Sequence, residues 1–82
     1  MKQLLKFSAT WCAPCKALSE NIKHVDMGDV EFKEIDIDEN LDVAKQYGIR
    51  GVPTLVLLED GEEIGRKSGV HTASVIEEFI NG

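Results

Sequence analysis

The sequence predicts an α/β fold with the element order β-α-β-α-β-β-α, in which a four-stranded mixed sheet is flanked by three helices. Short apolar runs of strand length alternate with segments whose apolar residues recur at helical spacing. Strands joined through a helix should lie parallel, whereas the turn signal Asp60-Gly61 predicts an antiparallel hairpin at the end of the sheet. With 82 residues, the chain has room for one domain, over residues 1–82.

The first two elements are a strand and an amphipathic helix. We expect the strand over residues 2–9, where three side chains are large and apolar. Pro14 fits the first turn of the helix that follows, because its missing N–H costs nothing there. The buried stripe of this helix is predicted by apolar residues at i, i+4 and i+7, namely Leu18, Ile22 and Val25.

A second strand and a short helix come next. Residues 27–29 should end the first helix, and the strand is expected over residues 30–37. The acidic segment 38–40 then supplies an N-cap and an acidic first turn for a short helix. Gly48 is a suitable C-cap for it. Its inner face should consist of Val43, Ala44 and Tyr47.

The last third of the chain predicts a hairpin and a final helix. Residues 52–58 are nearly all apolar, as expected of a strand that is covered on both faces. Residues 64–68 form the returning strand of the hairpin. Thr72 can cap the last helix. The buried stripe of that helix should consist of Ile76, Phe79 and Ile80.

The charge of the chain excludes several classes of partner. Its net charge is −6 at pH 7, from 15 acidic and 9 basic residues. Nucleic acids and anionic membranes both require a basic surface, so neither is expected to bind.

No apolar run approaches the roughly 18 residues of a membrane span, and the first residues lack the apolar stretch of a secretory signal. We therefore expect a cytoplasmic protein that acts as a monomer.

The two cysteines form a CxxC pair where the first strand gives way to the first helix. Two cysteines are too few for a disulfide scaffold, and a bridge across three positions constrains little of the unfolded chain. An unperturbed thiol is only a few per cent ionised at pH 7, but the N-terminus of a helix stabilises a thiolate. Cys12 lies at that end and Cys15 lies one turn further on. One sulfur can therefore attack a disulfide and the other can resolve the product.

A zinc site and an inert structural pair are the alternatives to exchange chemistry. Zinc needs four ligands, and the sequence has no second CxxC; His24 and His71 also lack the spacing of a ligand pair. If the pair were inert, Trp11 and Pro14 would have no purpose at this junction. We expect neither a metal nor a bound cofactor.

Two motifs carry a resemblance to a known family. Residues 11–16, WCAPCK, resemble the WCGPCK signature of thioredoxins, with Ala13 in place of the glycine. Residues 47–54, YGIRGVPT, resemble the YGIRGIPT segment of the same family, and Gly69 matches the glycine that follows the last strand. The resemblance covers essentially the whole chain and implies the thioredoxin fold. The first strand and helix of the family are absent, which leaves a core of about the size of a glutaredoxin.

The resemblance implies a role for each residue of the site. Cys12 is expected to be the exposed nucleophile that forms a mixed disulfide, and Cys15 the buried thiol that resolves it. The residues alone would favour a trans proline that begins a strand at position 53, but the resemblance implies a cis bond between Val52 and Pro53 beside the cysteines. The backbone of Val52 could then pair with a substrate chain as a short added strand. The implied docking surface consists of Trp11, Gly51, Val52, Pro53, Gly69 and Val70.

One pair of charges departs from the family pattern. Thioredoxins usually carry a buried aspartate in the first strand, six residues before the nucleophile, where this chain has Lys6. The partner lysine of the family, on the neighbouring strand, corresponds to Glu34. One interpretation is a reversed ion pair beneath the active site, in which Lys6 favours the thiolate and Glu34 accepts a proton. The alternative is that both side chains turn outward as ordinary surface charges.

The sequence thus predicts a dithiol that reduces disulfide-containing proteins. Cys12 would attack the disulfide of the partner, and Cys15 would displace the mixed disulfide. The resemblance implies a flavin-dependent thioredoxin reductase as the electron source, with ribonucleotide reductase and peroxiredoxins among the substrates. The alternatives are a glutaredoxin-like reductase that depends on glutathione and a redox-independent binding subunit of a larger complex.

Overall fold

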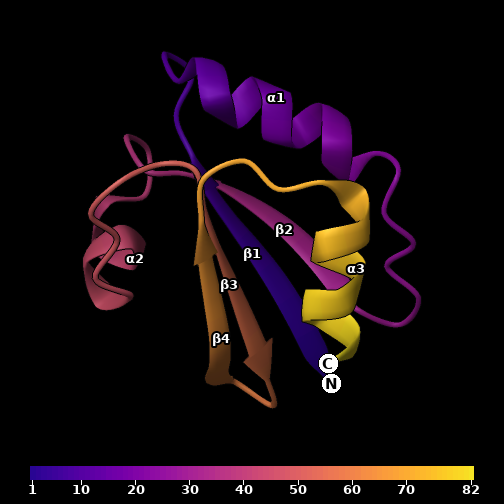
Figure 1. Ribbon diagram of the computed structural model, residues 1–82. Coiled ribbons are helices and arrows are strands. Elements are labelled where there is room, and N and C mark those ends of the chain that lie inside the picture. The colour runs from indigo at the N-terminus through magenta and orange to yellow at the C-terminus, as the bar shows by residue number, and fades with distance from the viewer.

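A single four-stranded sheet forms the centre of the computed structural model, which describes residues 1–82 (Figure 1). The strand order is β2-β1-β3-β4, with β1 parallel to β2 and antiparallel to β3, and β3 antiparallel to β4. The mixed sheet and the element order are therefore as predicted. The elements are β1 (Lys2–Ser8), α1 (Ala13–Ile22), β2 (Glu31–Asp36), α2 (Leu41–Gln46), β3 (Thr54–Glu59), β4 (Glu62–Ser68) and α3 (Ala73–Asn81).

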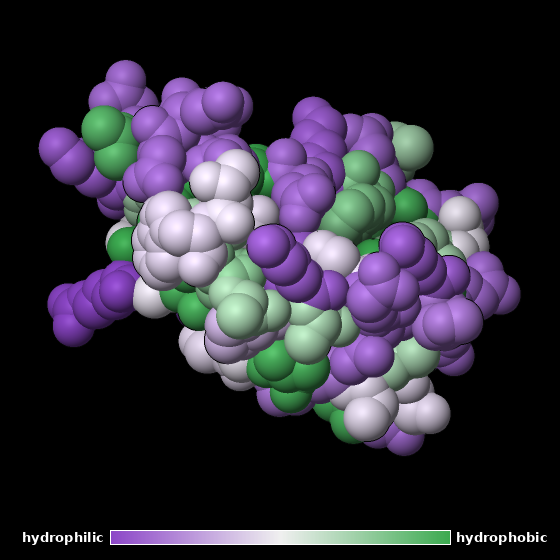
Figure 2. Space-filling model, turned by 90° about the horizontal axis from the view of Figure 1, so that it is seen from above, coloured by the Kyte–Doolittle hydropathy of each residue, from purple (hydrophilic) through white to green (hydrophobic).

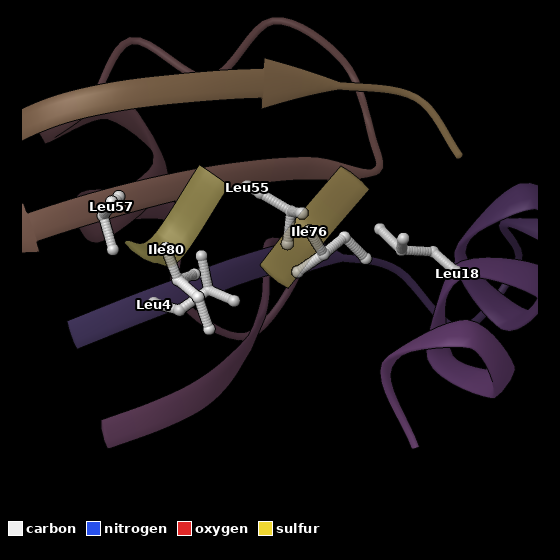
Figure 3. Packing of buried hydrophobic residues seen from close by; sticks show 6 residues of the cluster. All are labelled: Leu4, Leu18, Leu55, Leu57, Ile76 and Ile80. Carbon is white, nitrogen blue, oxygen red and sulfur yellow. The ribbon is translucent and has the colours of Figure 1, made fainter. Parts of the chain in front are cut away.

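Helices cover both faces of the sheet because successive side chains of the central strands point to opposite sides. Leu4 of β1 belongs to the face that α1 and α3 cover, and Leu18 reaches this cluster from α1 (Figure 3). Its six buried members are Leu4, Leu18, Leu55, Leu57, Ile76 and Ile80. The other face packs against α2 through a second cluster, which contains Leu5, Phe7, Val56 and Leu58. None of the three helices could cross a membrane, since each is too short or too polar.

Several element boundaries differ from the prediction, among them the start of β4 at Glu62 rather than at residue 64, and two of the differences have a clear local reason. Helix α1 ends at Ile22 because the chain then tightens into bonds of three-residue spacing, such as that from Val25 N to Ile22 O (3.0 Å). Val25 lies beyond the end of the helix but still packs against the core. Its burial was therefore predicted correctly, whereas its assignment to the helix was wrong. Strand β3 begins at Thr54 rather than at residue 52, since Pro53 has no N–H to donate to a ladder.

The short helix α2 is capped differently from the prediction. Asn40 occupies the N-cap, but its side chain makes no capping hydrogen bond and donates instead to the carbonyl of Asp36 (3.0 Å). Asp42 is the acidic residue of the first turn, so the expectation that residues 38 and 39 fill this role was wrong. Thr72 caps α3 as predicted, because its hydroxyl oxygen accepts a hydrogen bond from Val75 N (3.3 Å).

Candidate active site

The two cysteines lie at the N-terminus of α1, above one end of the sheet (Figure 1). Cys12 is the N-cap residue, with extended backbone angles (φ −94°, ψ 106°), and Ala13 and Pro14 are the first two residues of the helix. Cys15 follows one turn on, with its Cα atom 5.3 Å from that of Cys12, and the two residues form a disulfide. The sequence prediction that both sulfurs come within bonding reach is confirmed.

The helix terminus provides a hydrogen bond to the sulfur of Cys12. The backbone N–H of Cys15 donates to Cys12 Sγ over 3.2 Å. This N–H is one of those that have no partner within the helix. A donor and the positive end of the helix dipole at the same sulfur both stabilise a thiolate relative to a thiol. Once the disulfide is reduced, Cys12 therefore lies where an attacking thiolate is favoured.

The exposure of Cys12 differs from the prediction. In this disulfide form its side chain is as inaccessible as that of Cys15, with relative exposures of 4% and 2%. Both sulfur residues pack with Ala9 in a small cluster that Ile37 and Val52 also contact. The expectation of an exposed Cys12 was wrong for the oxidised protein, in which its side chain packs into this cluster. The burial predicted for Cys15 is confirmed.

Apolar and backbone groups surround the disulfide. The peptide bond between Val52 and Pro53 is cis, as the resemblance implied, and Pro53 is buried. Gly69 has a φ of +88°, a conformation that glycine adopts without strain, and its N–H donates to the carbonyl of Pro53 (3.0 Å). Gly51 is exposed at the start of this loop. These contacts attach the end of β4 to the proline loop beside the cysteines.

Two large exposed side chains extend this surface. Trp11 is 67% exposed and Val70 is 45% exposed. The indole N–H of Trp11 donates to Asp38 Oδ2 over 2.9 Å, which fixes the direction of the ring. Asp38 was predicted to be part of a helix cap instead, because nothing in its local pattern connects it to a residue 27 positions earlier. Figure 2 looks down on this end of the molecule and shows pale and green atoms surrounded by purple, hydrophilic side chains.

Lys6 and Glu34 form the reversed ion pair. They are directly opposite each other in the parallel ladder of β1 and β2, and Lys6 Nζ lies 2.6 Å from Glu34 Oε2. Lys6 is 1% exposed and also donates to Ser19 Oγ of α1. The side chain of Glu34 is 51% exposed and accepts a further hydrogen bond from Ser8 Oγ (3.3 Å). The alternative of two outward-facing charges is therefore wrong for Lys6, whereas Glu34 is half open to water.

A polar cleft of about 350 Å³ lies beside this ion pair. Cys15 lines it together with both charges of the pair, whereas Cys12 does not. Ser19, which the sequence analysis missed, also lines it. Its position four residues after Cys15, on the same face of α1, was the available signal. The chain contains no group of three or more His, Cys, Asp or Glu residues that could hold a metal ion.

Known proteins share both this fold and this sequence. A family model described as Thioredoxin matches residues 1–82. The thioredoxin of Bacillus subtilis strain 168 is 37% identical over 81 residues, which cover 95% of this chain and 78% of that protein. A variant of the thioredoxin of Halobacterium salinarum NRC-1 superposes with a TM-score of 0.90 at 37% identity, over 98% of this chain and 72% of that one.

A third comparison concerns a yeast structure. It is 36% identical to this chain, with a TM-score of 0.81 over 98% of this chain and 76% of the other, and its description concerns thiol resolution in a mitochondrial 1-Cys peroxiredoxin through the glutathione and thioredoxin systems. The family match covers every residue that shapes the site, from the disulfide at the helix N-terminus to the cis proline beside it. The chain therefore belongs to the thioredoxin family and is a dithiol–disulfide oxidoreductase of the thioredoxin type.

Proposed function

We propose that this chain transfers electrons from a flavin-dependent thioredoxin reductase to disulfide-containing proteins. The observation that carries the proposal is the disulfide between the N-cap residue Cys12 and Cys15, at a helix end that stabilises a thiolate. Peroxiredoxins and ribonucleotide reductase are the proposed acceptors. The yeast structure described above links a similar fold to a peroxiredoxin. Because the dithiol has to be kept reduced, we place the protein in the cytoplasm.

The proposed reaction has two exchange steps. The Cys12 thiolate attacks one sulfur of the partner's disulfide, and the other partner sulfur leaves with the bonding electron pair. The Cys15 thiolate then attacks Cys12 Sγ, the bond to the partner breaks, and the second partner sulfur leaves in the same way. The partner has gained two electrons and takes up two protons, and this chain is left with the disulfide that the structure contains.

The proposed docking surface is the apolar rim around the disulfide. It comprises Trp11, Gly51, Val52, Pro53, Gly69 and Val70. Neither the N–H nor the carbonyl of Val52 takes part in a backbone hydrogen bond, so both can pair with an extended partner segment. The adjacent carbonyl of Pro53 is already bonded to Gly69 N. This leaves Val52 as the residue that would fix the register of the partner.

An NADPH-coupled assay tests the electron source. The oxidised protein is offered either a thioredoxin reductase or glutathione with glutathione reductase, and a disulfide-bonded peroxiredoxin is the acceptor. We expect turnover with thioredoxin reductase and little with glutathione. Faster turnover with glutathione would replace the proposal with the glutaredoxin-like alternative.

Two cysteine variants test the order of the steps. Cys15→Ser should trap the partner in a mixed disulfide on Cys12, whereas Cys12→Ser should form none. Mixed disulfides through Cys15 alone would overturn the assignment of the nucleophile. If the double variant Cys12→Ser, Cys15→Ser kept the biological activity of the protein, the redox-independent binding role would be favoured instead.

A further inference from the structure

Strand β4 is an open edge of the sheet. It lies at one end of the strand order β2-β1-β3-β4, where β3 is its only neighbour (Figure 1). The backbone N–H and C=O groups that point away from β3 therefore have no partner within the sheet. An edge of this kind can accept a further strand unless its side chains prevent it. The side chains of β4 thus determine which strand can be added.

The charges of β4 are complementary to those of a second, antiparallel copy of the same strand. Residues 62–67 read EEIGRK, so two acidic residues precede an apolar pair and two basic residues follow it. When two such strands run antiparallel about their common centre, Glu62 faces Lys67 of the second copy, and Glu63 faces Arg66. Opposite charges that face each other across an antiparallel pair stabilise it, whereas like charges destabilise it.

A β-bulge makes this register possible. In a regular strand, residues an odd number of positions apart point to opposite faces of the sheet, so Glu62 of one copy could not meet Lys67 of another. In β4 the ladder with β3 shifts its register beside Leu57 and Leu58, which leaves Ile64 as an extra residue. The extra residue brings side chains on either side of it onto the same face at odd separations.

The contacts of Lys67 and Glu62 show that both lie on the face that α3 covers. Lys67 Nζ lies 5.5 Å from the centre of the Phe79 ring, which belongs to α3. The ladder partner of Glu62 is Glu59, two positions after Leu57 of the cluster under α3. The acidic and the basic end of β4 can therefore meet on one side of a sheet built from two copies.

Glu63 and Arg66 share the opposite face, which α2 covers. Arg66 donates to the carbonyl of Tyr47 at the end of α2 (2.6 Å) and to Glu63 through two hydrogen bonds of 2.8 Å. A register shifted by one residue would place Glu63 opposite Lys67, or Arg66 opposite Glu62, and these side chains point to different faces. Charges on an edge strand usually prevent pairing with other chains, but here they favour one partner in one register.

An exposed apolar side chain lies at the centre of this edge. Ile64 is 52% exposed and lines a groove of about 400 Å³ between β4 and α3, together with Phe79. In the paired register Ile64 lies opposite Gly65 of the second copy, which has no side chain and lies beside Phe79 of that copy. A central apolar contact with charged pairs at its ends is the usual arrangement of a protein interface.

We propose that two copies of this chain associate through β4, antiparallel and with Ile64 opposite Gly65, so that their sheets become continuous. The sequence analysis predicted a monomer, and this inference replaces that prediction with an equilibrium between monomer and dimer. Small interfaces are transient, so the dimer forms at high protein concentration. None of the paired residues belongs to the proposed docking surface, and the inference does not depend on the proposed function.

Sedimentation velocity of the oxidised protein tests for the dimer, from about 10 μM to about 1 mM protein at about 0.15 M salt. The oxidised form has no free cysteine, so a disulfide between copies cannot produce the result. We expect the mean mass to rise from that of the monomer toward twice that value as the concentration increases. A mass that stays at the monomer value throughout this range would overturn the proposal.

Reversed charges test the register. Glu62→Lys places lysine opposite lysine, and Lys67→Glu places glutamate opposite glutamate. Each variant alone should dimerise about tenfold more weakly than the wild type, because the altered pair occurs twice in the dimer. An equal mixture of the two variants should associate as strongly as the wild type, since every lysine then faces a glutamate. The double variant Glu62→Lys, Lys67→Glu should also recover the dimer. If neither the mixture nor the double variant recovers it, the register is wrong.

Glu31→Lys and Lys33→Glu are the matched controls. They change the net charge of the chain in the same way, at exposed positions of β2 on the other edge of the sheet. Both controls should dimerise like the wild type. Loss of the dimer in these variants, with Glu62→Lys unaffected, would place the contact on β2 and refute the proposal. Glu62 is exposed, so its reversal should leave the fold of the monomer intact.

Amide chemical shifts locate the contact residue by residue. Between dilute and concentrated samples, the changes should be centred on Gly65 and extend along β4, whereas Trp11 and Val52 beside the disulfide should not change. Changes centred on Trp11 and Val52 would show association through the docking surface instead, and the proposal would be wrong. None of these measurements involves electron transfer, so they can fail or succeed whichever reductant and acceptor the protein uses.

Discussion

Replacing the two members of the buried ion pair should affect stability very unequally. Glu34→Gln leaves Lys6 charged and buried with only Ser19 as a partner, whereas Lys6→Met removes the buried charge and leaves Glu34 to be hydrated. Breaking a buried pair from one side is costly because the remaining charge is uncompensated, but replacing the pair with apolar groups is often neutral. The glutamate variant should therefore be the less stable of the two.

The exposure of Glu34 determines how much stability the protein should lose in Glu34→Gln. Removing one partner of a fully buried pair costs about 3–5 kcal/mol. Here water reaches one partner, whose side chain is 51% exposed, and Lys6 keeps its bond to Ser19. We therefore expect Glu34→Gln to cost about 2 kcal/mol and Lys6→Met to stay within about 1 kcal/mol of the wild type. For a domain of this size, with a total stability of roughly 4–12 kcal/mol, that difference is readily measured.

Urea unfolding of the oxidised protein at neutral pH measures these free energies directly. The double variant Lys6→Met, Glu34→Gln should match Lys6→Met alone, which gives a coupling energy of about 2 kcal/mol in the double-mutant cycle. Glu31→Gln, which removes an exposed carboxylate from the same strand, is the control and should cost less than about 0.5 kcal/mol. The reasoning fails if Glu34→Gln costs no more than Glu31→Gln, or if Lys6→Met is the more damaging substitution.

Three further predictions concern the core, a surface ion pair and the contact between β4 and α3. Leu18→Ala should lower the free energy of unfolding in urea by about 3 kcal/mol, because this side chain of α1 is fully buried against the sheet and its loss leaves a cavity. The pKa of Glu63 is lowered chiefly by the hydrogen bond that its carboxylate accepts from Arg66. The ionised carboxylate therefore adds a small stability at neutral pH, which is lost as the pH falls through the folded-state pKa. In the variant Arg66→Gln this pKa should return toward its ordinary 4.5, as an NMR titration would measure. Gly65→Ala should destabilise the protein by about 1 kcal/mol, since its Cβ would lie 2.7 Å from the ring of Phe79, and the cost in the same unfolding assay should largely vanish when Phe79 is replaced by leucine.

The periodicity of the apolar residues was sufficient to predict the fold. Leu18 was placed on the buried stripe of its helix and is fully buried, and Thr72 was correctly predicted to cap α3. These predictions succeeded because burial on one face and capping depend on spacing within a single element. Val25 shows the limit of the approach, because its spacing matches the stripe of α1 although the chain has already left the helix there.

Features of the site that depend on contacts between distant segments were not predictable from the residues alone. The bond between Trp11 and Asp38 joins residues 27 positions apart, and no local pattern indicates it. The cis bond before Pro53 followed only from the resemblance to the family. The burial of Cys12 also escaped prediction, because it depends on how the disulfide packs against Ala9 and its neighbours. Spacing identified the reactive pair, but tertiary packing determines its accessibility.

The disulfide lies between two surfaces of different character, one apolar and one polar. Ile37 and Val52 contact the cysteine cluster, whereas Cys15 alone of the two cysteines lines the polar cleft. A partner that docked on the proposed surface would therefore approach Cys12 without displacing the ion pair.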